Sequence, residues 1–100
     1  DLAFTYMHLG VFYAETADYA QAEEFLFKAL KIQEEVLDAN HVDRADTYRM
    51  LGTIFLRTEN YASSMEYFLK ALQIHESRHD TKPITLAKSY QSVGLAYCWL

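Results

Sequence analysis

The sequence contains little of the material that interrupts helices or crosslinks a chain: one proline, three glycines and one cysteine in 100 residues. Ala, Leu, Glu, Lys and Gln, which all favour helices, fill most segments. The composition therefore predicts a mostly helical chain. The single cysteine, Cys98, cannot form an internal disulfide, so nothing indicates an oxidising compartment, and we expect a cytoplasmic location.

Positive charge and long apolar runs are also lacking. The formal net charge is -5 at pH 7 and Lys and Arg form no block, which argues against a protein that binds nucleic acid by neutralising phosphates. No apolar run approaches the ~20 residues that cross a bilayer, and no basic region precedes an apolar one at the N-terminus. We therefore expect neither a membrane helix nor a signal peptide. The first residue is not Met, which suggests a fragment of a longer chain.

A repeat of constant period runs through the chain. The segment AFTYMHLGVFY at 3–13 recurs as ADTYRMLGTIF at 45–55 and as AKSYQSVGLAY at 87–97, with the same offset both times. Ala, Tyr and Gly recur at matched positions in all three copies: Ala3, Tyr6, Gly10, Ala45, Tyr48, Gly52, Ala87, Tyr90 and Gly94. The expected repeats span about 3–44, about 45–86 and, for the start of a third, about 87–100.

Apolar residues at helical spacing, interrupted by short polar stretches, predict two helices in each copy. We expect first helices at about 2–16, 44–58 and 84–99, and second helices at about 19–38 and 61–79. A glycine inside a helix costs about 1 kcal/mol relative to alanine. A glycine in every first helix therefore predicts close contact between the two helices of a repeat. Asp18 and Asn60 are suited to cap the second helices.

Further matched residues carry a family resemblance: Tyr6, Leu9, Gly10, Tyr13, Ala22, Leu26 and Ala29 in the first copy, and Tyr48, Leu51, Gly52, Phe55, Ser64, Phe68 and Ala71 in the second. This pattern resembles the tetratricopeptide repeat, whose usual period is about 34 residues. The longer period here is similar to the repeats of kinesin light chains. The resemblance implies an all-α, right-handed solenoid of antiparallel helix pairs that binds proteins and needs no cofactor.

The stretch HESRH at 75–79 matches HExxH, which places two zinc ligands on one helix face with a glutamate between them. In the repeat, however, it falls at the end of a second helix. A catalytic zinc needs three protein ligands and an open position, and no third ligand follows at a suitable spacing. We therefore interpret His75 and His79 as partly exposed, expect no metal, and expect His75→Ala to change stability by no more than about 0.5 kcal/mol.

No other group of residues indicates catalysis. Cys98 has no histidine near it in the sequence and lies on a predicted helix. The carboxylates between residues 23 and 35 alternate with Lys28 and Lys31 at helical spacing, which is typical of a solvated helix face. We therefore expect no enzymatic activity.

The first helices of such a solenoid form its concave wall, where this architecture binds peptides. The family's inward-facing positions correspond here to a candidate peptide-binding set: Met7, Val11, Arg49, Thr53, Arg57, Gln91, Leu95 and Trp99. Arg49 and Arg57 lie about two turns apart on one helix, so together with apolar neighbours they favour a short ligand that combines acidic and bulky apolar residues. In the alternative interpretation, these arginines pair with Asp46, Glu15 or Glu59 and bind nothing.

Two functions stay open at this point. One is an interaction scaffold that binds a peptide or partner helix on its concave face. The other is a regulatory or spacer segment of a larger enzyme or signalling protein. The sequence ends on a first helix with no second helix to cover Tyr90, Val93 and Tyr97, so we also expect self-association through this end.

Overall fold

The computed structural model describes residues 2–36, 41–77 and 83–99. These ranges form five helices: α1 (Leu2–Glu15), α2 (Tyr19–Val36), α3 (Val42–Arg57), α4 (Tyr61–Ser77) and α5 (Pro83–Trp99). They contain no strand, which confirms the predicted all-α class. The described helix ends agree with the expected ones to within two residues, while the expected ends at 38 and 79 lie outside the described residues.

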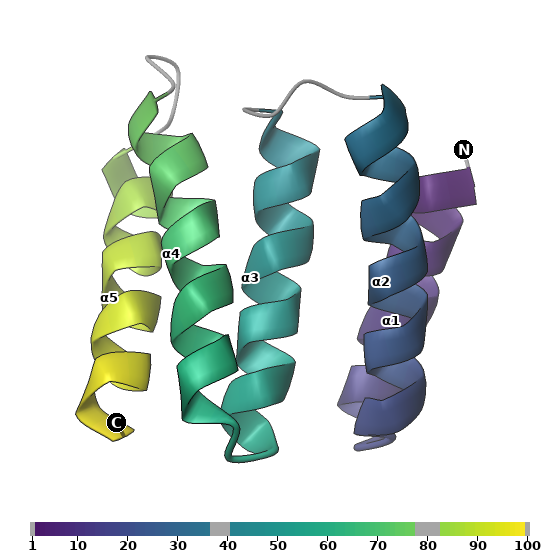
Figure 1. The fold of residues 1–100 in the computed structure, drawn as a ribbon, viewed down its shortest axis with the longest axis horizontal. Coiled ribbons are helices and arrows are strands. Elements are labelled where there is room, and N and C mark those ends of the chain that lie inside the picture. Colours follow the sequence, from purple (N-terminus) through teal and green to yellow (C-terminus); the bar gives the residue numbers. More distant parts are fainter. Residues whose placement is uncertain (1, 37–40, 78–82, 100) are drawn as a thin grey trace.

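Consecutive helices pack against each other and build an open stack, as the repeat predicts (Figure 1). The α1–α2 pair lies at one edge, the α3–α4 pair follows, and α5 packs on α4 at the other edge. The N-terminus and the C-terminus therefore lie at opposite edges of the stack. As far as the five helices are described, none is both long and apolar enough to cross a membrane.

The core lies where the two repeats meet, between α2, α3 and α4. Most of its buried members have small or branched apolar side chains, and two have aromatic rings. They are Ala22, Leu26, Leu30, Ala45, Tyr48, Leu51, Ile54, Phe55, Ala71 and Ile74. Three of these, Ala22, Leu26 and Leu30, lie on one face of α2 at helical spacing. The core therefore joins the two repeats into one packed unit.

Two of the three glycines allow helices to touch. A β-carbon at Gly10 would lie 2.6 Å from Leu26 Cγ, and one at Gly52 would lie 2.8 Å from the ring of Phe68. Both distances are far below van der Waals contact, so the predicted packing role is confirmed at these positions. At Gly94 nothing in the described chain lies within 4 Å of a β-carbon, and no second helix of the third copy is among these residues, so the prediction is not tested there.

The turns inside both repeats have the same geometry. Ala17 and Glu59, which occupy equivalent positions of the two repeats, both have left-handed backbones with φ of 62° and 65°. In the first turn, the Asp18 N–H donates to Tyr13 O at 2.8 Å and the Ala17 N–H donates to Ala14 O at 3.1 Å. This pair of bonds is the Schellman motif, which satisfies the last carbonyls of a helix and usually contains glycine. Here the left-handed position carries a side chain in both repeats.

Replacing Glu59 with glycine should therefore raise the free energy of unfolding by about 0.5–1 kcal/mol, because a left-handed backbone is unfavourable for a residue with a β-carbon. Urea denaturation followed by circular dichroism measures this change. Thr58→Gly is the matched control, since Thr58 has φ of -90°. The explanation fails if glycine at the control position stabilises the chain as much.

Helix α3 begins at Val42, two residues before the expected start. The reason is a cap: His41 has an extended backbone, and its Nδ1 accepts a hydrogen bond of 3.1 Å from the Asp43 N–H. Histidine is not among the usual capping residues, so the sequence did not predict it. The predicted cap on α2 is present but long, with 3.4 Å between the Gln21 nitrogen and Asp18 Oδ1.

Candidate functional site

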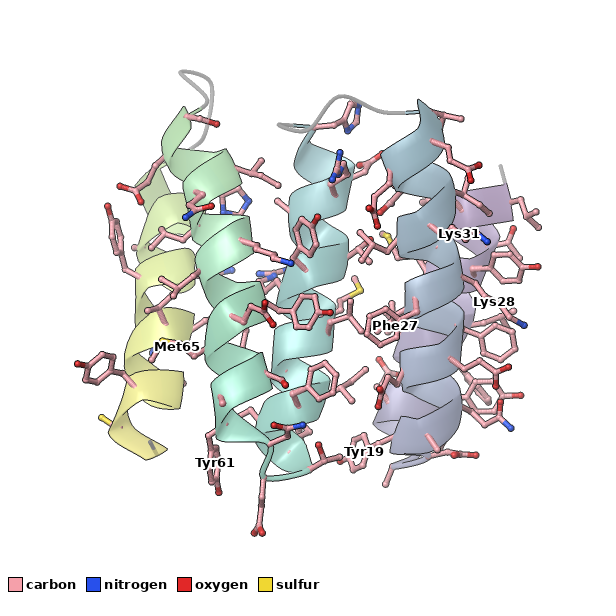
Figure 2. The ribbon with its side chains drawn as sticks, in the orientation of Figure 1. Tyr19, Phe27, Lys28, Lys31, Tyr61 and Met65 are labelled. Atoms are coloured by element: carbon pink, nitrogen blue, oxygen red, sulfur yellow. The ribbon has the colours of Figure 1, made fainter. Side chains whose placement is uncertain are left out.

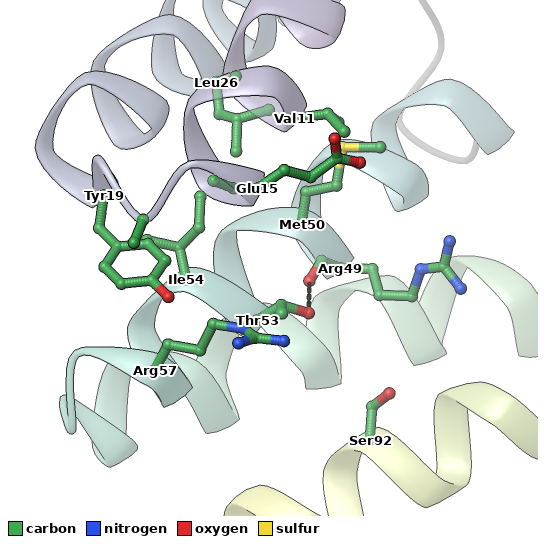
Figure 3. Close-up of a pocket in the computed structure, with 13 residues that line it drawn as sticks. Val11, Glu15, Tyr19, Leu26, Arg49, Met50, Thr53, Ile54, Arg57 and Ser92 are labelled. Carbon is green, nitrogen blue, oxygen red and sulfur yellow. Dashed lines mark hydrogen bonds between the residues drawn. The ribbon is translucent and has the colours of Figure 1, made fainter.

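A pocket of about 680 Å³ opens between α1, α3 and α5. Its lining includes residues of these three helices, of α2 and of the first turn: Gly10, Val11, Ala14, Glu15, Ala17, Tyr19, Leu26, Arg49, Met50, Thr53, Ile54, Arg57 and Ser92. Figure 3 shows Arg49 and Arg57 on either side of Thr53 along α3, with Glu15 of α1 and Ser92 of α5 on opposite sides. The pocket thus combines two guanidinium groups with an apolar floor.

Four residues of the predicted peptide-binding set meet in this pocket: Val11, Arg49, Thr53 and Arg57. Among the other four, the described side chains of Met7, Gln91 and Leu95 do not line it. Met7 is half-buried, Gln91 and Leu95 are exposed on α5, and the side chain of Trp99 lies outside the described residues. Ser92 lines the pocket although it was not in the set; it is the repeat counterpart of Met50, another lining residue, so the repeat period alone would have indicated it.

In the described residues, the carboxylates around the two arginines lie beyond ion-pair distance. Within the described ranges, neither Arg49 nor Arg57 forms an ion pair with a carboxylate, so the pairing with Asp46, Glu15 or Glu59 is not observed. Burial raises the pKa of the Asp46 carboxyl, and the positive charge of Arg49 opposes this rise only in part. The Thr53 hydroxyl donates to the backbone carbonyl of Arg49 at 3.0 Å. This hydrogen bond does not involve either guanidinium group.

The family of this protein follows from its repeat. A family model described as Tetratricopeptide repeat matches residues 1–77, which is most of the chain. The chain belongs to the tetratricopeptide repeat family. The match does not distinguish the kinesin-light-chain-like form, so that finer resemblance stays a prediction. A comparison with curated proteins gave no match.

In this tetratricopeptide repeat chain, Met7 contributes to the junction between repeats rather than to the pocket. The Thr47 hydroxyl lies 2.7 Å from Gln33 Oε1 and 3.3 Å from Met7 Sδ. Thr47 is 0% exposed and Gln33 is 3% exposed. A buried polar contact of this kind holds three helices, α1, α2 and α3, in one relative position.

The structure corrects the interpretation of HESRH. His75 is buried, with only 2% of its surface exposed, and a positive charge on its ring would lower the pKa of the Asp46 carboxyl of α3. The expectation of a partly exposed side chain is therefore wrong for His75, so the reason for expecting a near-neutral substitution no longer holds. His79 lies outside the described residues. In the ranges that the structure describes, no three His, Cys, Asp or Glu side chains are grouped to hold a metal ion.

We now expect His75→Ala to lower the free energy of unfolding by about 1–3 kcal/mol, because it removes a buried ring and leaves a void. Gln73→Ala, an exposed position on the same helix, should change it by no more than about 0.5 kcal/mol. Urea denaturation of both variants gives the difference. Calorimetric titration should show no stoichiometric zinc binding at micromolar concentration, and tight binding lost in His75→Ala would reverse this interpretation.

Proposed function

We propose that this chain is a protein-interaction module that binds a short segment of a partner in the pocket between α1, α3 and α5. The observation that carries the proposal is the pair of guanidinium groups, Arg49 and Arg57, which form no ion pair within the described ranges and lie beside an apolar floor. Membership of the tetratricopeptide repeat family supports an interaction role, because stacked helix pairs present concave surfaces to partners.

The chemistry of the pocket favours a segment that carries acidic and bulky apolar residues. Guanidinium groups form charge-assisted, often bidentate, hydrogen bonds with carboxylates. Because Arg49 and Arg57 lie about 12 Å apart along α3, they suit two carboxylates separated by three or four residues of an extended chain. Val11, Met50 and Ile54 line the same pocket and provide apolar contact between those two charges.

The double variant Arg49→Ala/Arg57→Ala should weaken binding of such a segment by about 1–3 kcal/mol, the range for lost charge-assisted bonds. A synthetic array of acidic–aromatic peptides supplies the probe, and fluorescence anisotropy measures the affinity. The helical content should stay unchanged, because Arg57 is exposed and Arg49 has no ion pair among the described residues.

Lys31→Ala/Lys70→Ala is the matched control, since it removes the same charge from exposed side chains that do not line the pocket, and Figure 2 shows Lys31 pointing from α2 away from α3. Its affinity should equal that of the unmodified chain. If both double variants bind equally well, the interface lies outside the pocket. If both lose affinity equally, the attraction reflects overall charge rather than this site.

A further inference from the structure

The pocket carries charges of opposite sign on two of its walls. Among the described residues that line it, Glu15 is the only carboxylate, and Arg49 and Arg57 are the only cations. Glu15 is the last residue of α1, whereas both arginines belong to α3, and Figure 3 shows them entering the pocket from these different helices. The pocket therefore has an anionic wall on α1 and a cationic wall on α3.

The repeat shows that the two walls differ in charge at the same position. Glu15 and Arg57 are equivalent residues, because the offset between them is the one that relates Gly10 to Gly52. Each is exposed, and each is the last residue of its helix. Two first helices that share a sequence pattern therefore present opposite charges to the same pocket.

Local stability does not explain a carboxylate at this position. The C-terminus of a helix carries a partial negative charge, which repels an anionic side chain and attracts a cationic one. Arg57 therefore has the favourable sign at the end of α3, and Glu15 has the unfavourable sign at the end of α1. Within the described ranges, no ion pair of Glu15 offsets this repulsion. A residue that is unfavourable for its own helix is typical of a functional surface.

We propose that Glu15 sets the charge specificity of the pocket by selecting a segment in which a basic residue accompanies the two acidic ones, an inference that rests on the proposed function. The basic side chain faces α1 and pairs with Glu15, while the acidic side chains face α3 and pair with Arg49 and Arg57. A carboxylate that faced α1 would be repelled by Glu15. The ligand is thus a segment of mixed charge, and a uniformly acidic segment binds more weakly.

The geometry of an extended chain determines where the basic residue stands in such a segment. Successive side chains of an extended chain point to opposite sides, so residues two and four apart share a side. Acidic residues at the first and fifth positions both face α3, and an apolar residue at the third position lies between them. The residues at the second and fourth positions face α1. We therefore expect lysine or arginine at one or both of these positions.

The test compares three synthetic peptides that differ only at the positions facing α1. The lysine probe contains Glu-Lys-Phe-Lys-Glu between flexible glycine–serine ends, and the glutamine and glutamate probes replace both lysines with those residues. In fluorescence anisotropy, the unmodified chain should bind the lysine probe about three- to fivefold more tightly than the glutamine probe, the range for an exposed ion pair. It should bind the glutamate probe more weakly than either.

Substitutions at Glu15 should change this order. In Glu15→Gln the advantage of the lysine probe over the glutamine probe should disappear, and in Glu15→Lys the glutamate probe should bind most tightly. Glu15→Gln should not lower the urea midpoint, because it removes an unfavourable interaction with the end of α1. Glu35→Gln and Glu35→Lys are the matched controls, since Glu35 is an exposed residue of α2 that does not line the pocket. Both controls should retain the order of the unmodified chain.

Failure of this inference can be told apart from failure of the proposed function. If Arg49→Ala/Arg57→Ala weakens binding of the glutamine probe but Glu15→Gln still prefers lysine, the pocket binds the segment and Glu15 does not set its charge. If the Glu35 variants change the order as much as the Glu15 variants do, the net charge of -5 is responsible and the inference is wrong. If the unmodified chain binds none of the three probes, both proposals are wrong.

Discussion

Replacing Gly52 with alanine should lower the free energy of unfolding by about 1–2 kcal/mol, whereas the same change at Gly94 should raise it by up to about 1 kcal/mol. A β-carbon at Gly52 would lie 2.8 Å from the ring of Phe68, which is 3% exposed, so the buried ring would have to shift to admit it. At Gly94 nothing in the described chain lies within 4 Å, so only the better helix propensity of alanine counts. Urea denaturation measures both changes.

The pair of substitutions separates packing from helix propensity, because both sites are in first helices and receive the same side chain. Equal stabilisation by both would mean that α3 and α4 are further apart than the structure shows. Equal destabilisation would mean that α5 is covered, as it would be in a dimer that uses this face. Sedimentation of the unmodified chain then tests the predicted self-association directly.

A second large effect is expected at Leu26. Leu26 is 0% exposed and belongs to the core that joins the repeats, so Leu26→Ala should cost about 2–5 kcal/mol, the range for a buried leucine that leaves a cavity. A domain of this size is stabilised by only about 5–15 kcal/mol, so the loss should be visible as a lower urea midpoint.

Leu26 is also the residue that prevents a side chain at Gly10, at 2.6 Å from a β-carbon there. Gly10→Ala alone should therefore destabilise the chain, but added to Leu26→Ala it should be neutral or stabilising, because the methyl group enters the space that leucine left. A double-mutant cycle measures this coupling. Additive losses would show that Gly10 is needed for a reason other than contact with Leu26.

Much of the fold was predictable from the sequence because the same residues recur at equivalent positions of each repeat. The constant period placed Gly10 and Gly52 in equivalent positions and indicated a contact that both then make. The first residues of helices were harder to predict. Helix α3, for example, is capped by His41, and histidine has no strong capping preference.

The candidate site was predicted in part, and the errors have a physical origin. Position in the repeat placed Val11, Arg49, Thr53 and Arg57 in one pocket, because a straight helix keeps residues four apart on one side. Pattern rules place polar side chains outside, so they did not indicate that His75 is buried. Its counterpart in the first repeat, Gln33, is buried too, and only the packing of the next first helix reveals this.

The polar junction of Met7, Gln33 and Thr47 has a consequence for evolution of binding. A hydrogen bond is directional, whereas apolar packing tolerates small rotations, so the 2.7 Å contact between Thr47 and Gln33 fixes the angle at which one repeat follows the next. That angle sets the curvature of the concave wall. Substitutions at these buried positions should therefore change the curvature of the concave wall and with it the ligands that fit, although no ligand in the pocket would touch these residues.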